Sequence, residues 1–216
     1  MTSKLTLPDT ASIADTGPDG RMFAPSTARN IDAIAAVLSD HAPKSGMALE
    51  IASGTGEHVA QLASQHPGLT WQPTDPDPAR RRSIDGHGHG IPNLRPAMDL
   101  DATAPGWSAE HRGQDLIQLV NLLHLIPEPA AKTLIAEVAL ALAPGGRFVL
   151  YGPFLRDGET SSEGDARFND SLISQDPSIG YKDDWDVIEW IQENWLELVQ
   201  VIEMPANNLC FIARKP

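Results

Sequence analysis

The stretch that decides the fold is Glu50-Ile-Ala-Ser-Gly-Thr-Gly-Glu-His58. It follows the apolar run Met47-Ala-Leu49 and precedes the helical pattern Val59-Ala-Gln-Leu-Ala63, which predicts a strand, a glycine-rich turn and the start of a helix. Gly54 and Gly56 allow a sharp turn and let a ligand come close to the main chain. Free N–H groups at the helix start favour a ligand that carries negative or partly negative oxygens.

The same stretch lacks the third glycine of a dinucleotide-binding fingerprint. That fingerprint reads G-x-G-x-x-G, and its last glycine allows close packing of the helix on the strand. Counted from Gly54, the third position is Val59. A pyrophosphate ligand, and with it an NAD-dependent oxidoreductase, is therefore disfavoured, and a nucleoside ligand without phosphates fits better.

Length and charge set limits on the class of protein. The chain has 216 residues, which suits one α/β domain over 21–216, preceded by a flexible lead-in over 1–20. The net charge of −13 disfavours nucleic acid as a partner, and we interpret the one basic run, Arg80-Arg-Arg82, as the solvated face of a helix. The single cysteine, Cys210, excludes an intramolecular disulfide and fits a cytoplasmic location. The sequence shows no membrane span and no secretory leader.

Strands and helices alternate over most of the sequence, which predicts an α/β fold with a mostly parallel sheet and helices on both faces. Seven strands are expected, at 47–52, 69–72, 94–100 (the weakest), 116–120, 147–151, 198–204 and 209–214. The four-residue link 205–208 predicts that the last two strands form an antiparallel hairpin.

Helices are expected after a cap at Ser26 or Thr27, after the glycine turn, over 79–84, over 129–142, and around Trp185 and Trp195. The segment 85–90 is predicted to be a loop, and the polar segment 157–180 an insertion that folds over the site.

Several short motifs resemble a known family. They are Ala28-Arg-Asn-Ile31, Leu49 to His58, Trp71-Gln-Pro-Thr-Asp75, Leu100-Asp101, Asn121-Leu-Leu-His124, Tyr151-Gly-Pro-Phe154 and Met204-Pro-Ala-Asn-Asn-Leu-Cys210. The sequence resembles the small methyltransferase-like family that includes methyltransferase-like protein 26, within the class I S-adenosylmethionine-dependent methyltransferases. The resemblance runs from about residue 26 to the end of the chain. It implies a Rossmann-like class I methyltransferase fold with S-adenosylmethionine as the cofactor.

The resemblance also implies roles for the residues around the first two strands. Glu50 would orient the loop or receive the amino group of the cofactor, and Ser53, Gly54 and Gly56 would present backbone groups to its methionine moiety. Asp75 comes 19 residues beyond Gly56, near the spacing at which an acidic residue accepts hydrogen bonds from ribose hydroxyls. Asp77 competes for that role, and a simple turn at Asp75 is the plainer alternative.

Further candidates follow the third and fourth expected strands. Asp101 would face the adenine edge, with Asp99 as its competitor and helix capping as the alternative. Asn121 would hold the cofactor, since ligands of open α/β sheets bind beyond the carboxyl ends of the strands. His124 is a candidate general base because an ordinary imidazole titrates near neutrality, although a packed structural histidine explains it equally well.

Three polar residues are candidates for the substrate side or a lid. Arg29 and Asn30 would cover the cofactor or meet an anionic substrate, unless they only cap the following helix, and Tyr151 would form a pocket wall. Asn207 and Asn208 are most simply turn residues, although the Met-Pro-Ala-Asn-Asn motif is unusual.

No metal site is expected. His87 and His89 lie near Asp85 in a glycine-rich segment, but a second pair of ligands is missing. The main hypothesis is therefore an S-adenosylmethionine-dependent methyltransferase that acts on a small molecule. The alternative is a protein with the same fold that holds the cofactor, or a partner protein, without turnover. The acceptor and the oligomeric state stay open.

Overall fold

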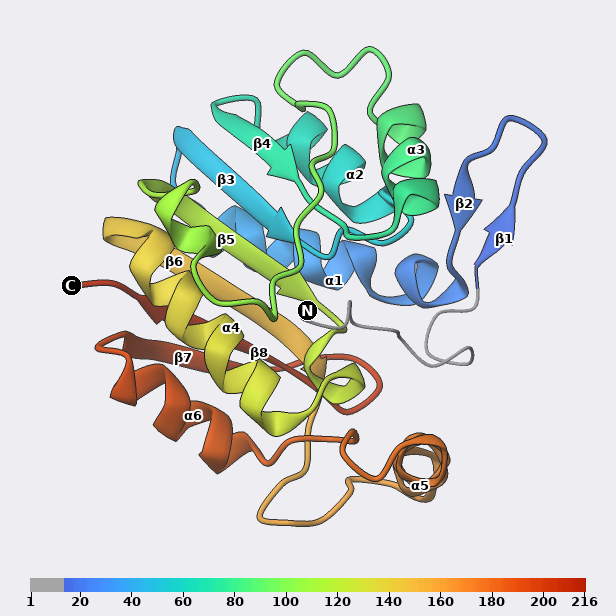
Figure 1. The fold of residues 1–216 in the computed structure, drawn as a ribbon, viewed down its shortest axis with the longest axis vertical. Helices are drawn as coiled ribbons and strands as arrows, with labels where there is room; N and C mark the ends of the chain where they lie inside the picture. Colours follow the sequence, from blue (N-terminus) through green and yellow to red (C-terminus); the bar gives the residue numbers. More distant parts are fainter. Residues whose placement is uncertain (1–13) are drawn as a thin grey trace.

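Six strands form the central sheet of the protein, whose computed structural model describes residues 14–216 (Figure 1). The order across the sheet is β4 (Leu69–Pro73), β3 (Gly46–Ile51), β5 (Gln114–Val120), β6 (Leu142–Pro153), β8 (Asn208–Arg214) and β7 (Glu197–Glu203). The pairs β3–β4, β3–β5 and β5–β6 are parallel, whereas β8 is antiparallel to both of its neighbours. One strand is thus reversed, which confirms the mostly parallel sheet with a C-terminal hairpin.

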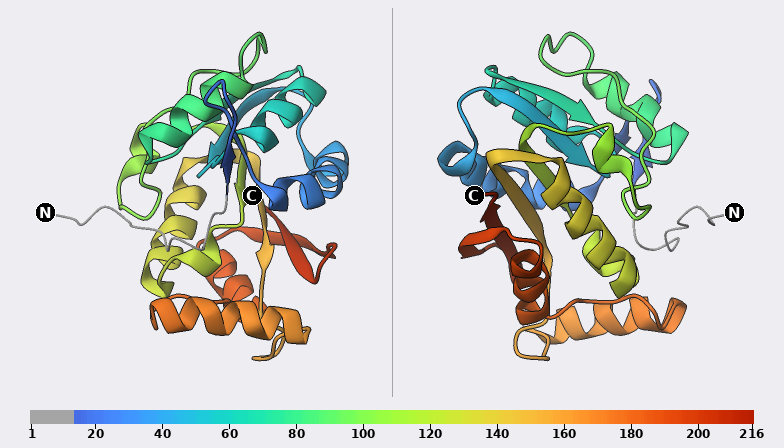
Figure 2. Two further views of the ribbon diagram at one scale, coloured as in Figure 1. Left: turned by 90° about the vertical axis from the view of Figure 1, so that its right-hand side faces the viewer. Right: turned by 60° about the vertical axis from the view of Figure 1, so that its left-hand side comes forward.

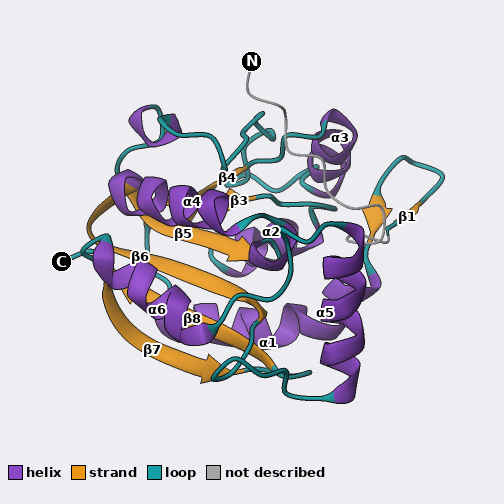
Figure 3. Ribbon diagram, turned by 60° about the horizontal axis from the view of Figure 1, so that its bottom comes forward, coloured by secondary structure: helices purple, strands orange, loops and turns teal. Residues whose placement is uncertain are grey.

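Helices cover both faces of this sheet (Figure 2). One face packs against α1 (Pro25–His41), α2 (Glu57–Gln65) and α3 (Pro78–His87), and the other against α4 (Glu128–Ala141) and α6 (Asp184–Glu193). Two short 3-10 helices, η1 (Trp107–Ala109) and η2 (Leu123–Leu125), flank β5. Helix α5 (Glu163–Gln175) stands beyond the end of the sheet toward which β5 points (Figure 3).

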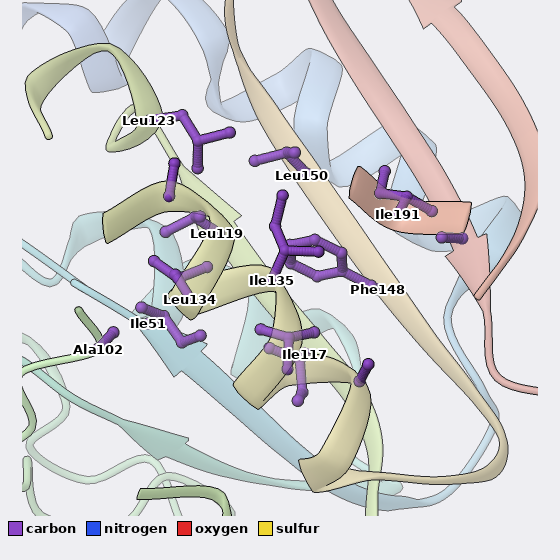
Figure 4. Packing of buried hydrophobic residues seen from close by; sticks show 14 of the residues in the cluster. Ile51, Ala102, Ile117, Leu119, Leu123, Leu134, Ile135, Phe148, Leu150 and Ile191 are labelled. Carbon is purple, nitrogen blue, oxygen red and sulfur yellow. The ribbon is translucent and has the colours of Figure 1, made fainter. Parts of the chain in front are cut away.

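The hydrophobic core has two parts because neighbouring residues of a strand face opposite sides of the sheet. In β5, Leu116 packs with the α1–α3 side, and Ile117 packs with the α4 side. Figure 4 shows the α4 side, where Leu134 and Ile135 lie against side chains of the sheet such as Phe148. All five side chains are fully buried, so each stabilises the sheet by about 1.5–3 kcal/mol relative to an exposed position.

The expectation of a seventh strand at 94–100 is wrong. This segment runs beside β4 in parallel but makes only two isolated bridges, from Leu94 to Trp71 and from Met98 to Thr74. Between them stands Pro96, which has no N–H to donate, and its carbonyl accepts a 2.8 Å hydrogen bond from the Gln72 side chain instead of from a backbone group. The ladder is therefore interrupted, and the sheet has six strands.

Several expected helix boundaries also differ from the structure. The helix expected after a cap at Ser26 or Thr27 begins at Pro25, and no side chain caps it. The helix expected over 79–84 runs on to His87, so the first half of the segment 85–90 is helical rather than a loop. The last helix ends at Glu193, which leaves Trp195 outside it and 86% exposed.

Two other segments add structure that the sequence did not predict. The polar segment 157–180 holds α5, which Ser162 caps by accepting a 3.2 Å hydrogen bond from the Asp165 N–H. A two-stranded hairpin, β1 (Asp15–Thr16) and β2 (Met22–Phe23), precedes α1. Most of the lead-in predicted over 1–20 lies outside the described residues. Within 14–216 no helix has the length and apolar character needed to cross a membrane.

The topology fixes where a ligand is expected. The chain moves from β3 outward to β4 and then returns to pair β5 on the other side of β3. The strand order therefore reverses between β3 and β5, and open α/β sheets bind their ligands beyond the carboxyl ends of the strands at such a point.

Candidate functional site

The glycine turn lies at the carboxyl end of β3. Its backbone is left-handed at Ala52 (φ 52°), Gly54 (φ 60°) and Gly56 (φ 93°). A Cβ atom on Gly56 would lie 2.6 Å from the Cα of Ile84, so this glycine allows α3 to pack closely against the turn. Ala52 has a side chain in a conformation that costs about 1–3 kcal/mol, a form of strain that clusters at ligand sites.

Ser53 fastens the turn to the end of β4. Its N–H donates to the Thr74 carbonyl (2.8 Å), and its Oγ accepts from the Thr74 N–H (3.2 Å). The Thr74 hydroxyl in turn donates to the backbone carbonyl of Glu50 (2.8 Å). The turn is therefore held in place before any ligand binds.

Asp75 supports the turn from the neighbouring strand. Its Oδ2 accepts a 3.0 Å hydrogen bond from the Gly54 N–H, and its Oδ1 accepts a 2.9 Å hydrogen bond from the Asp77 N–H. The side chain is buried, and this burial raises the pKa of its carboxyl, while the two hydrogen bonds and Arg80 oppose the rise. Asp77 is half exposed and caps α3 by accepting from the Ala79 N–H (2.7 Å). Of the two competing acids, Asp75 is the one that lies against the glycine turn.

Glu50 and Gln118 lie side by side at the reversal of strand order. They are register partners on β3 and β5, and Gln118 Nε2 donates to Glu50 Oε1 at 3.1 Å. The other oxygens, Glu50 Oε2 and Gln118 Oε1, are buried and have no hydrogen-bond partner within residues 14–216. Burial raises the pKa of Glu50 to about 8; the nearby Asp75 adds to this rise, and the side chains of Ser53 and Gln118 oppose it. Two buried oxygens without a partner are costly, and once Glu50 is ionised both become acceptors that fit a ligand with N–H groups.

A second polar network joins α1, α2 and the carboxyl end of β6. Asn30 of α1 accepts a 2.9 Å hydrogen bond at Oδ1 from Nε2 of His58 in α2, and its side chain also hydrogen-bonds the Tyr151 hydroxyl at the end of β6. Burial lowers the pKa of His58 to about 4, which keeps the imidazole neutral, and it raises the pKa of Tyr151. Arg29 is exposed, and its charge opposes the rise at Tyr151, so it also lies near that hydroxyl.

Asn121 and His124 follow β5, as the sequence predicts. Asn121 has a left-handed backbone (φ 56°), and its N–H donates to the Tyr151 carbonyl at 2.9 Å. His124 lies in η2 and is 5% exposed, between the rings of Phe168 and Tyr181. Burial, aided by the charge of Lys182, lowers the pKa of His124 to about 3. Such a weak base is poorly suited to take a proton in the unliganded protein.

Asp101 is engaged with its own turn. Its Oδ1 accepts hydrogen bonds from the Thr103 N–H (3.0 Å) and the Thr103 hydroxyl (2.6 Å). Asp99, its competitor, forms an ion pair with Arg81 at 3.3 Å. Contact of either acid with adenine stays a prediction.

The unusual Met-Pro-Ala-Asn-Asn motif connects the C-terminal hairpin to α5. Asn207 Nδ2 donates to Asp165 Oδ2 of α5 at 2.9 Å, and the Asn207 carbonyl accepts from Arg156 Nη2 at 3.1 Å. Asn207 has a left-handed backbone (φ 59°), which asparagine tolerates better than most residues. The motif therefore does more than turn the chain, because it also holds the helix that stands beyond the sheet.

The histidines of the glycine-rich segment point elsewhere. His87 lies on α3, where its Nε2 is 2.9 Å from the Met22 carbonyl and its ring packs edge-on against Phe23. Within the described part of the chain no three His, Cys, Asp or Glu residues gather as metal ligands would.

The structure thus brings Glu50, Ser53, Gly54, Gly56 and Asp75 into one cluster and places Asn121 at the neighbouring strand end. Two further residues of these networks, Gln118 and His58, were not predicted from the sequence. Gln118 had a signal, since it is polar within the apolar run 116–120. His58 was quoted as part of the glycine motif, but nothing in the sequence pairs it with Asn30.

The fold is that of solved O-methyltransferases. An O-methyltransferase family 2 protein from Planctomyces limnophilus DSM 3776, solved in complex with apigenin, is 21% identical and has a TM-score of 0.74, with 87% of this chain and 56% of that chain covered. An O-methyltransferase family protein from Burkholderia thailandensis is 17% identical, with a TM-score of 0.72 and coverage of 88% and 56%. PigF, solved with SAH, is 18% identical, with a TM-score of 0.69 and coverage of 86% and 54%. The chain spans little more than half the length of these structures.

The family follows from a second comparison. A family model described as "Protein of unknown function (DUF938)" matches residues 21–215. The chain belongs to this family.

Proposed function

We propose that the protein is an S-adenosylmethionine-dependent methyltransferase that transfers a methyl group to a small molecule. The observation that carries the proposal is the pair of buried oxygens, Glu50 Oε2 and Gln118 Oε1, that have no hydrogen-bond partner within residues 14–216. They lie at the reversal of strand order beside a glycine turn, where an amino-acid ammonium group would supply the missing N–H donors. PigF and CalO1 were solved with SAH, and SibL is an S-adenosylmethionine-dependent methyltransferase, which supports the same ligand here.

The remaining residues of the turn fit the rest of this ligand. The backbone around Ser53, Gly54 and Gly56 would face the methionine moiety, and Asp75, whose two oxygens each keep a free lone pair, would accept hydrogen bonds from the ribose hydroxyls. Asp101 and Asn121 remain our candidates for contacts with adenine and with the body of the cofactor. Bound S-adenosylmethionine supplies a methyl group activated by its sulfonium sulfur.

The chain's own contribution to the reaction is mainly positioning. A sulfonium is an active methyl donor, so in-line placement of an acceptor atom accounts for much of the rate enhancement. The neutral His124 and the Tyr151 hydroxyl, held by Asn30, are the polar groups we assign to the acceptor side. The O-methyltransferase neighbours support an oxygen acceptor, and the motifs at 28–31 and 204–210 support kinship with methyltransferase-like protein 26.

Two measurements test this function. Isothermal titration calorimetry with S-adenosylmethionine and S-adenosylhomocysteine should show binding at one site per chain. Incubation with methyl-labelled S-adenosylmethionine and a fractionated cell extract should then yield label in the small-molecule fraction. Binding without transfer to any fraction would indicate a protein that holds the cofactor without turnover.

A further inference from the structure

Lys182 is a buried cation with unused hydrogen-bond donors. The residue is 9% exposed, and its ammonium group donates one hydrogen bond, to the Gly180 carbonyl at 2.8 Å. Within residues 14–216 no carboxylate lies within ion-pair distance of it. Burial lowers its pKa to about 8, and the carboxylate that opposes this effect, Glu128, is half exposed and forms its own 2.7 Å ion pair with Lys132. An ammonium group has three donors and is costly to bury without a partner, so this one is suited to an anionic ligand.

His124 lies near Lys182, and its ring nitrogens are also open to hydrogen bonding. The Gly180 N–H donates to the His124 carbonyl at 3.0 Å, so the segment that carries Lys182 is fixed to η2. Neither ring nitrogen of His124 has a hydrogen-bond partner in the described part of the chain. The charge of Lys182 acts directly on the imidazole and helps to keep it neutral.

Aromatic side chains complete this group. The ring centroids of Phe168 and Tyr181 lie 5.9 and 6.0 Å from that of His124, and 6.1 Å from each other. Phe168 comes from α5, which stands beyond the end of the sheet (Figures 1 and 3), and it is 38% exposed. An open aromatic ring against His124, whose imidazole feels the charge of Lys182, favours a flat, apolar ligand with one negative oxygen.

Nearby acids form hydrogen bonds elsewhere. Asp165 of α5 accepts from the side chains of Ser162, Asn207 and Tyr181. Asp183, next to Lys182 in the chain, accepts hydrogen bonds from the Gly158 and Trp185 N–H groups. Within residues 14–216 neither acid forms an ion pair with Lys182, so its ammonium group stays open to an anionic ligand.

We propose that Lys182 and His124 bind the methyl acceptor as an oxyanion, and that the acceptor is a phenol or a similarly acidic enol. This assignment rests on the function proposed above and names its substrate class. The acceptor hydroxyl loses its proton to solvent on binding, and the ammonium group of Lys182 stabilises the anion. An oxygen lone pair then forms the new carbon–oxygen bond while the carbon–sulfur bond breaks and its electron pair returns to sulfur. The products are a neutral methyl ether and a neutral thioether.

The test compares two probes of nearly equal shape, 4-nitrophenol and 4-nitroanisole, in the presence of S-adenosylhomocysteine. The wild type should bind 4-nitrophenol at least about tenfold more tightly than 4-nitroanisole, the expected effect of a charge-assisted hydrogen bond. The absorption spectrum of bound 4-nitrophenol should show the phenolate at a lower pH than the free compound. Lys182→Met should reduce the preference to within about twofold, and Lys182→Arg, which keeps the charge, should retain most of it.

The experiment distinguishes a wrong acceptor assignment from a wrong cofactor assignment. Equal affinity for both probes, or no measurable binding of either, would overturn the phenol assignment, as would an unchanged preference in Lys182→Met. The spectral titration of the wild type decides the question even if a Lys182 variant does not fold. S-adenosylhomocysteine binding, measured in the same samples, should be unaffected by Lys182→Met, and its absence in the wild type would refute the methyltransferase function itself.

Discussion

Replacement of Glu50 by Gln should stabilise the protein and do so more strongly as the pH rises. The pKa of Glu50 is raised by burial from 4.5 to about 8. Between these two pH values the unfolded chain carries the charged carboxylate while the folded protein keeps the neutral acid, so the free energy of unfolding falls as the pH rises. The slope is about 1.4 kcal/mol per pH unit, which amounts to about 3 kcal/mol between pH 5 and pH 7.5.

Gln at this position cannot ionise, so its curve lacks this slope. Its amide also keeps an N–H donor at every pH beside Gln118 Oε1, which is buried without a partner within residues 14–216. Urea denaturation followed by tryptophan fluorescence, repeated from pH 5 to pH 7.5, measures the difference. The exposed Glu110→Gln variant is the control, and its curve should run parallel to that of the wild type. Parallel curves for Glu50→Gln and the wild type would refute the assignment of a raised pKa to Glu50.

The same substitution should impair the site that it stabilises. A ligand ammonium group beside Glu50 favours the charged carboxylate, so binding should release about 0.9 proton at pH 7 in the wild type. Calorimetry of S-adenosylhomocysteine binding in buffers of different ionisation enthalpy measures this proton, and Glu50→Gln should release none. Such a loss of function with a gain of stability is the pattern expected of a site residue.

Three further substitutions test the other parts of the site. Asp75→Ala should weaken S-adenosylhomocysteine binding by about 1.5–3 kcal/mol in calorimetry. The control Asp77→Ala should bind the ligand as the wild type does and lose only about 1 kcal/mol of stability with its helix cap. Equal affinities of the two variants for S-adenosylhomocysteine would mean that the wrong acid was chosen. Asn30→Ala leaves a buried imidazole and a buried hydroxyl without a partner, and should lower the free energy of unfolding by about 1–3 kcal/mol; an unchanged urea midpoint would contradict the network. Asn207→Gly keeps the left-handed turn but loses the bond to α5, so amide exchange should accelerate across 163–175 and not in α4.

Much of the fold follows from local patterns in the sequence. The apolar run 116–120 and the alternating strands and helices predict a parallel sheet, and the short link 205–208 predicts the reversed strand that the structure contains. The strand predicted at 94–100 does not form, because Pro96 interrupts the backbone pairing with β4 on either side of it. Two helices start earlier than the sequence predicted. Helix α1 begins at Pro25, and α3 begins directly after its cap, Asp77.

The candidate site was predictable where its residues lie in short motifs at the ends of strands. The glycine turn and Asp75 can be recognised by spacing along the chain. The role of Gln118 depends on its hydrogen bond to Glu50 on β3, 68 residues earlier in the sequence. The role of Lys182 depends on its position near His124, where its charge acts on the imidazole. Such pairings depend on the folded sheet and on α5, and no periodicity or spacing of the single sequence encodes them.

Calorimetric titration of the wild type with S-adenosylhomocysteine at pH 7 tests the central claim most directly. The proposed function predicts saturable binding at one site per chain, with heats that change with the ionisation enthalpy of the buffer because Glu50 gives up its proton. No detectable heat of binding, together with an unchanged melting temperature in the presence of the ligand, would contradict the assignment of the glycine turn, Glu50 and Asp75 to this cofactor.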